Sequence, residues 1–182
     1  NAYNLLDRND FETGLLESVS PTNGNVAMLA YSPLAGGALT GKYKRSIKKK
    51  GLVGEDGWRF SEYIGFQHRY IADPAIEALD AYQKIADNLS LPLGPLSLAF
   101  VTSRRFTTST VLGVTSVHQL KENVQSLNIQ INEEIESLFN AVYDQHRDPT
   151  KGVFEVYDPK SEYIDPTKLP WGAKDVDVDP EL

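Results

Sequence analysis

Residues 26–37 read VAMLAYSPLAGG, an apolar run followed at once by a turn-forming segment. The run at 26–31 has the length of one strand and no polar alternation, which is typical of a strand buried on both faces in a parallel sheet. The proline and glycines at 33–37 favour a turn directly after this strand. This segment predicts an α/β fold in which a loop leaves the carboxyl end of a buried parallel strand.

A second strand is predicted further along the chain, at residues 107–113, TTSTVLG. It is short and rich in β-branched residues. It runs directly into an amphipathic helix, at whose start Ser116 and Gln119 have the spacing of a capping box. An apolar stripe runs along this helix. The stripe comprises Val117, Leu120, Val124 and Leu127.

Further helices are predicted around the two strands. Asp10 should cap a short helix before the first strand, and Asp73 with Pro74 should begin a longer helix between the strands. A more buried helix is expected at 96–101, and Asn132 should cap the last helix. Strands that alternate with helices predict right-handed crossovers in a parallel sheet, although two strands alone make a marginal sheet.

Length and composition exclude several classes of partner and site. The chain has 182 residues, fewer than the ~250 typical of the commonest α/β barrel, and it does not begin with Met, so we expect further sequence upstream. A formal net charge of −7 disfavours nucleic acid and anionic membranes as partners, and we expect no transmembrane span. The absence of cysteine excludes disulfides and fits a reducing, cytoplasmic location, and the scattered histidines predict no metal site.

Two segments could hold an anion. GGALTGK at 36–42 matches part of a phosphate-binding loop, but Tyr43 replaces the hydroxyl residue that would hold Mg²⁺, so we do not expect a nucleoside triphosphatase. The other segment is the junction of Gly113 with the following helix, whose free N–H groups favour a phosphate. Each has a simpler interpretation. The lysines at 42–50 suit a solvated loop. Ser116 and Gln119 suit a plain capping box, with Glu122 and Asn123 facing water.

Taken together, the two segments resemble the aldo-keto reductase superfamily, in particular the branch that contains the potassium-channel β subunits and related bacterial and plant reductases. The motifs that carry the resemblance are YNLLDR at 3–8, LAYSPLAGG at 29–37 with LTGKY at 39–43, and GVTSVHQLKENV at 113–124. The resemblance covers residues 1–143. It implies an α/β fold, namely the C-terminal portion of a (β/α)8 TIM barrel with about strands 7 and 8 and their helices, plus an extended C-terminal tail.

The resemblance also implies a cofactor, NADP(H), bound across the C-terminal face of the barrel. Tyr31 matches an aromatic residue that stacks on the nicotinamide ring, and Lys42 matches a cation beside the pyrophosphate. Arg59 matches an arginine near the adenosine phosphate. The other matches are the pyrophosphate turn (Ser32, Pro33, Leu34 and Gly36), the cradle of the 2′-phosphate (Gly113, Thr115 and Gln119) and the adenine clamp (Glu122 and Asn123).

The family's catalytic Asp, Tyr, Lys and His are implied on earlier strands, so no catalytic residue is assigned to this chain. We expect residues 1–147 to be the C-terminal part of one barrel domain, with a long cofactor-side loop at 36–72. Residues 148–182 should form an acidic, Pro-rich tail that packs on the barrel through its aromatic residues, Phe154, Tyr157, Tyr163 and Trp171. In its full context the chain would serve the reduction of an aldehyde or ketone to an alcohol.

Two alternative functions stay open. A non-catalytic NADP-sensing or subunit-interaction module would use the same fold and cofactor without turnover. An unrelated binding function could use what remains of the fold. In each case exposed sheet edges favour association with the missing N-terminal part of the barrel or with a second copy of the chain.

Overall fold

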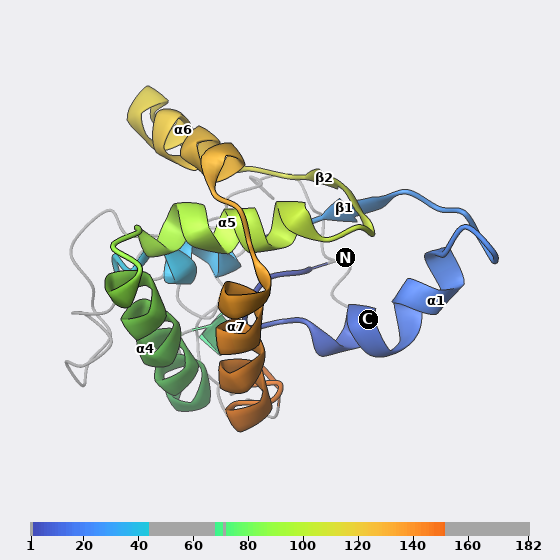
Figure 1. Ribbon diagram of the computed structural model, residues 1–182, viewed down its shortest axis with the longest axis horizontal. Coiled ribbons are helices and arrows are strands. Elements are labelled where there is room, and N and C mark those ends of the chain that lie inside the picture. Colours follow the sequence, from blue (N-terminus) through green and yellow to red (C-terminus); the bar gives the residue numbers. More distant parts are fainter. Residues whose placement is uncertain (1, 44–67, 71, 152–182) are drawn as a thin grey trace, which may run out of the picture.

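The computed structural model describes residues 2–43, 68–70 and 72–151. It contains two strands, β1 (Met28–Ala30) and β2 (Thr107–Thr110), which pair in parallel (Figure 1). Their register places Leu29 opposite Ser109 and Ala30 opposite Thr110. The prediction of an α/β fold with parallel strands is therefore confirmed for the described part of the chain.

The N-terminal segment adds a further parallel connection beside β1. Ala2 forms a parallel bridge with Tyr31, and the N–H of Tyr3 donates to the carbonyl of Tyr31 at 3.1 Å. On the other side of β1, the N–H of Val111 donates to the carbonyl of Ala30 at 2.9 Å. The N-terminal segment, β1 and β2 therefore run side by side in that order, with their carboxyl ends at one edge.

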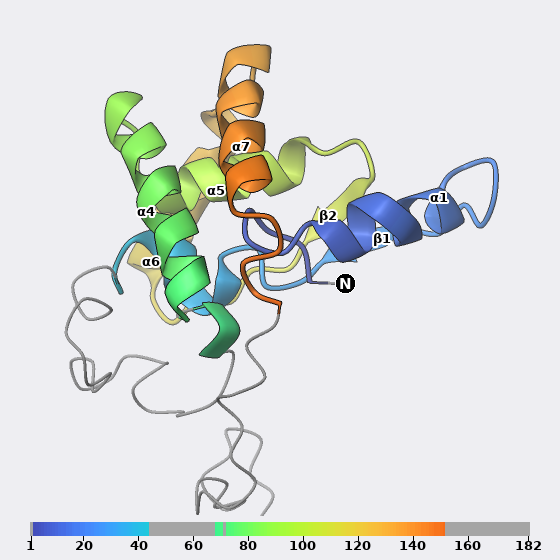
Figure 2. The same ribbon diagram turned by 90° about the horizontal axis from the view of Figure 1, so that it is seen from below.

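Three long helices build most of the core. They are α4 (Asp73–Asn88), α5 (Leu93–Ser103) and α7 (Glu133–Gln145). In Figure 1, α4 and α7 lie side by side and α5 runs across their upper ends, an arrangement that Figure 2 shows from below. The ring of Phe139 lies 5.7 Å from that of Tyr82 and 5.6 Å from that of Phe100, between ring centroids, so aromatic packing joins the three helices.

The predicted helix starts are correct in some cases and wrong in others. The side chain of Asn132 caps α7 by accepting from the N–H of Ile135 at 2.9 Å, as predicted. Asp10 makes no cap bond; it precedes a turn of π-helix, η1 (Phe11–Leu15), and α1 (Leu16–Val19), and its carboxylate pairs with Lys151 instead. Asp73 lies inside the first turn of α4, because Ala72 occupies the cap position.

One face of β1 is open, contrary to prediction. Met28 and Ala30 are buried, but Leu29 keeps 55% of its surface exposed. The predicted burial on both faces is therefore wrong for the described residues, because more than half of the surface of Leu29 is exposed.

The apolar stripe of α6 (Val117–Val124) and of the following turn η4 (Gln125–Asn128) is also exposed. The exposed fractions range from 43% at Leu120 to 74% at Leu127. The sequence correctly predicts the helix and its stripe, but it does not predict that this stripe would lack a cover within the described residues. None of the described helices combines the length and apolar character needed to cross a membrane.

Candidate functional site

The turn that follows β1 has an unusual backbone. Ser32 and Ala35 have positive φ angles of 53° and 51°, and Gly36 and Gly37 follow with 65° and 101°. The turn closes on itself, because the carbonyl of Ser32 accepts from the N–H of Ala35 at 2.9 Å and its hydroxyl accepts from the N–H of Gly36 at 3.3 Å. Positive φ at non-glycine residues is costly and is found where the surrounding structure enforces it.

Lys42 returns to this turn after the 3-10 turn η2 (Ala35–Thr40). A Cβ atom added to Gly37 would lie 3.2 Å from Cε and 3.5 Å from Nζ of Lys42, so the ammonium group lies against the glycine. Pro33 is buried and Leu34 packs against the core from a half-buried position. The structure therefore brings together five of the predicted cofactor residues, namely Ser32, Pro33, Leu34, Gly36 and Lys42.

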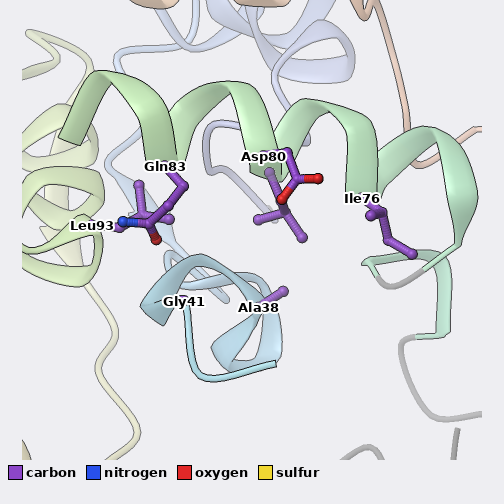
Figure 3. A pocket seen from close by; sticks show the side chains of 7 residues that line it. Ala38, Gly41, Ile76, Asp80, Gln83 and Leu93 are labelled. Atoms are coloured by element: carbon purple, nitrogen blue, oxygen red, sulfur yellow. The ribbon is translucent and has the colours of Figure 1, made fainter. Parts of the chain in front are cut away.

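A close approach to α4 holds η2 in place. Gly41 has φ +80°, and a Cβ there would lie 2.8 Å from Oε1 of Gln83. Between η2 and α4 lies a cavity of about 10 Å³ (Figure 3). This volume has room for about one water molecule, so the space is a packing defect and not a ligand pocket. It is lined by Ala38, Gly41, Ile76, Leu79, Asp80, Gln83 and Leu93.

The second predicted group lies at the junction of β2 with α6. Ser116 caps the helix by accepting from the N–H of Gln119 at 3.2 Å. The side chain of Gln119 accepts from the N–H and the hydroxyl of Thr115 at 2.9 and 3.1 Å, one residue before the position that a capping box would use. Gly113 has no atom within 4 Å of an added Cβ, so its backbone is open to a ligand.

Glu122 and Asn123, the predicted adenine clamp, differ in exposure. Glu122 is exposed and pairs with Nδ1 of His118 at 3.3 Å. Asn123 keeps only 8% of its surface exposed. The simpler interpretation, in which both residues face water, therefore holds for Glu122 and is wrong for Asn123.

The two predicted groups lie at the same end of the sheet. Tyr31 follows β1 with half of its surface exposed, and Gly113 follows β2, which pairs with β1. In parallel α/β folds the carboxyl ends of the strands are where ligands bind. Arg59 lies outside the described residues.

A larger groove of about 890 Å³ opens at the other end of the strands. Val26, Arg104 and Phe106 are among the residues that line it, and none of the predicted cofactor residues does. This groove is therefore separate from the described residues of the candidate site.

Sequence reasoning missed a cluster of buried polar side chains behind the turn after β1. Asn4 and Tyr70 are fully buried, and Asp7 keeps 6% of its surface exposed. Burial raises the pKa of Asp7, although Arg69, 3.3 Å from its carboxylate, acts in the opposite direction. Burial likewise raises the pKa of Tyr70. The motif YNLLDR at 3–8 contains Asn4 and Asp7 beside apolar residues, and these polar residues are the signal that the sequence offers for the cluster.

Comparison with known proteins gives consistent matches. A sequence model of the aldo/keto reductase family matches residues 1–144. An "Aldo-keto reductase" of Babesia bovis is 36% identical over 152 residues, which cover 82% of this chain and 52% of the relative. "Protein tas" of Escherichia coli (strain K12) is 39% identical over 149 residues, covering 82% and 40%.

A plant protein gives a further match. The "Probable voltage-gated potassium channel subunit beta" of Arabidopsis thaliana is 30% identical over 128 residues, covering 70% of this chain and 37% of the relative. The chain thus spans about half, or less, of the length of these relatives.

Proposed function

Because the chain belongs to the aldo/keto reductase family, we propose that it is the cofactor-binding, C-terminal part of a (β/α)8 barrel that holds NADP(H) for the reduction of an aldehyde or ketone. In this proposal residues 1–147 belong to one barrel domain and residues 36–72 form its cofactor-side loop. Residues 148–182 form a tail; the structure describes only its first four residues, 148–151.

The observation that carries the proposal is the return of Lys42 to the turn after β1. It gathers a cation, a glycine pair and a compact backbone turn at the carboxyl end of a parallel strand. The junction of β2 with α6 supplies a helix N-terminus with exposed hydroxyl side chains at the neighbouring strand end. A dinucleotide with several phosphates fits such a pair of anion sites.

The residues at these strand ends fit the parts of NADP(H). The half-exposed ring of Tyr31 offers a face for the nicotinamide, which supplies the hydride when bound. The Ser32 turn and Lys42 would hold the pyrophosphate, and Thr115 with Gln119 would hold the 2′-phosphate. Since Thr115 donates twice to Gln119, a phosphate would compete with Gln119 for these donors.

The barrel assignment is supported by the open faces of the chain. The N-terminal segment, β1 and β2 follow one another in parallel, as strands 6, 7 and 8 of a barrel would. Leu29 and Val117 are exposed on faces that the remainder of a barrel would cover. We assign no catalytic residue to this chain and propose that the proton donor for the reduction lies on earlier strands of the full protein.

The experiment that tests cofactor binding is a titration of the chain with NADPH and with NADH, measured by calorimetry. A 2′-phosphate held by charge-assisted hydrogen bonds should give NADPH an affinity about 10- to 100-fold higher than NADH. Equal affinities for the two nucleotides would contradict the proposed 2′-phosphate site. No binding of either would contradict the proposed function.

A second candidate function is an NADP-sensing or subunit-interaction module. It is favoured by the match to the Arabidopsis thaliana channel-subunit relative. Loss of NADPH absorbance on addition of an aldehyde to the full-length protein supports the reductase. NADPH binding without turnover of a panel of aldehydes supports the sensing module.

A further inference from the structure

Four polar residues form a connected cluster behind the Ser32 turn, which we call the Asn4–Tyr70 cluster. It consists of Asn4, Asp7, Arg69 and Tyr70. The side chains of Asn4 and Tyr70 are inaccessible to solvent, and Asp7 is nearly so. Buried polar groups destabilise a fold unless they are hydrogen bonded. The hydrogen bonds of each residue in this cluster therefore show which segments it connects.

Asn4 connects the N-terminal segment to the Ser32 turn. Its Oδ1 accepts from the N–H of Leu6 at 2.9 Å, which fixes the orientation of the amide. Its Nδ2 then donates to the carbonyl of Ser32 at 3.0 Å and lies 3.4 Å from the phenol oxygen of Tyr70. Both polar atoms of the amide are thus used, one within its own segment and one across to other segments.

Tyr70 connects the same amide to the turn η3 (His68–Tyr70). Its Oη accepts from Nη2 of Arg69 at 2.9 Å and donates to Oδ2 of Asp7 at 3.4 Å. Arg69 also pairs with Asp7 at 3.3 Å. The cluster therefore ties together three segments that are distant in sequence, namely the N-terminal segment, the turn after β1 and η3.

The bond from Asn4 acts on a strained residue. Ser32 has a φ of 53°, a left-handed conformation that a serine adopts only when other contacts hold it. Its carbonyl accepts from two donors, the N–H of Ala35 and the amide of Asn4. Removing the second donor would leave this conformation supported by the turn alone.

We propose that Asn4 and Tyr70 are positioning residues that hold the Ser32 turn in the conformation that binds the diphosphate of NADP(H). Neither residue needs to touch the cofactor, because the amide of Asn4 acts through the carbonyl of Ser32. The inference rests on the proposed function of the site and adds to it a dependence on η3. It requires that damage to the cluster weaken binding of the diphosphate while leaving the separate 2′-phosphate group intact.

The test compares two ligands on four proteins by calorimetry. NADPH contains both the diphosphate and the 2′-phosphate, whereas adenosine 2′-monophosphate contains the 2′-phosphate and adenine and no part of the diphosphate. The proteins are the unaltered chain and the variants Asn4→Asp, Tyr70→Phe and Tyr82→Phe. Asn4→Asp keeps the acceptor for Leu6 and removes the donor to Ser32, and Tyr70→Phe removes the phenol at the centre of the cluster.

Tyr82→Phe is the matched control. It removes a buried phenol that donates to the carbonyl of Leu5 at 3.0 Å, so it removes a bond to the same N-terminal segment but none to Ser32. We expect Asn4→Asp and Tyr70→Phe to weaken NADPH binding about 3- to 10-fold, the value of one hydrogen bond. Their affinity for adenosine 2′-monophosphate should stay unchanged, and Tyr82→Phe should change neither affinity.

The outcomes separate the two proposals. Unchanged NADPH affinity in both cluster variants overturns the positioning role, and so does an equal loss of affinity for both ligands. If Asn4→Asp does not fold, Tyr70→Phe decides alone. Failure of the unaltered chain to bind either ligand instead overturns the proposed function, and with it this inference.

Discussion

Arg8 and Glu12 form a two-point ion pair inside the protein. Nε of Arg8 lies 2.9 Å from Oε1 of Glu12, and Nη2 lies 3.1 Å from Oε2. The guanidinium carbon also lies 4.4 Å from the ring centroid of Tyr143 and 5.1 Å from that of Phe100. Arg8 keeps 6% of its surface exposed, so a single charged residue holds the N-terminal segment against α5 and α7.

Replacement of Arg8 should therefore destabilise the fold strongly. Arg8→Met keeps the length of the stem but removes both guanidinium donors from the Glu12 carboxylate, which retains the Tyr3 hydroxyl as a donor. It also removes the donor to Oδ1 of Asn140, 3.0 Å from Nη1. We expect the free energy of unfolding, measured by urea denaturation, to fall by about 2–4 kcal/mol. Arg147→Met is the control, since Arg147 is exposed and its ion pair with Asp144, screened by solvent, should contribute little to stability. Equal losses in the two variants would contradict a buried role for Arg8.

Stability should depend on pH through Asp7. Burial raises its native pKa above the ordinary value of 3.8, so the folded state holds the proton to higher pH than the unfolded state does. The cost of ionising Asp7 is absent below pH 3.8 and grows as pH rises toward the raised native pKa. Relative to Asp7→Asn, the unaltered chain should thus lose unfolding free energy as pH rises through this window. A constant difference between the two proteins from acid to neutral pH would refute the assignment.

Local chemistry made parts of the fold predictable from the sequence. Pro74 and Asn132 mark helix starts through their own backbone or side-chain preferences, and the structure has both helices there. The glycine-rich turn and Lys42 are close in sequence, so a motif could group them. By contrast, the hydrogen bond between Asn4 and Tyr70 joins residues that are 66 positions apart, and a local sequence pattern cannot predict such a contact.

The spacing of apolar residues predicts which face of a helix or strand is apolar, but it does not predict which other segment covers that face. It identified the stripe that includes Val117 and the apolar run that includes Leu29, and both are in the predicted elements. Burial of Leu29 and Val117 would need other segments to pack over them, and among the described residues both side chains stay largely exposed. The site residue Arg59 and the tail aromatics lie outside the described residues, so they stay predictions.

A substitution at Gly113 should weaken cofactor binding without changing the stability of the fold. An added Cβ would meet no atom within 4 Å, so Gly113→Ala should fold with unchanged stability. If the backbone there approaches the 2′-phosphate, the new methyl group should nevertheless weaken NADPH binding about tenfold or more. Gly14→Ala is the matched control, because its Cβ also meets nothing and it lies in η1, away from the site. Unchanged NADPH affinity in Gly113→Ala would exclude close approach of the cofactor at this residue.

Lys42 should contribute charge and not packing. Its side chain is exposed and lies over Gly37, so Lys42→Gln should leave stability unchanged within about 0.5 kcal/mol. Affinity for NADPH should fall about tenfold at low salt and depend less on ionic strength, because one cation near the phosphates is lost. Lys84→Gln removes the same charge from an exposed position on α4. A similar loss of affinity in both variants would assign the effect to net charge alone.

The boundary of the tail can be tested with two truncations. Residues 148–182 are predicted to form a tail that packs on the barrel. At its start, Thr150 keeps only 5% of its surface exposed, its hydroxyl lies 3.5 Å from the carbonyl of Leu6, and Lys151 pairs with Asp10. Removal of 152–182 retains these contacts, whereas removal of 148–182 loses them. We expect the longer deletion to lower the free energy of unfolding by about 1–2 kcal/mol relative to the shorter one, as measured by urea denaturation. Equal stability of the two truncated proteins would mean that the contacts of residues 148–151 do not stabilise the fold.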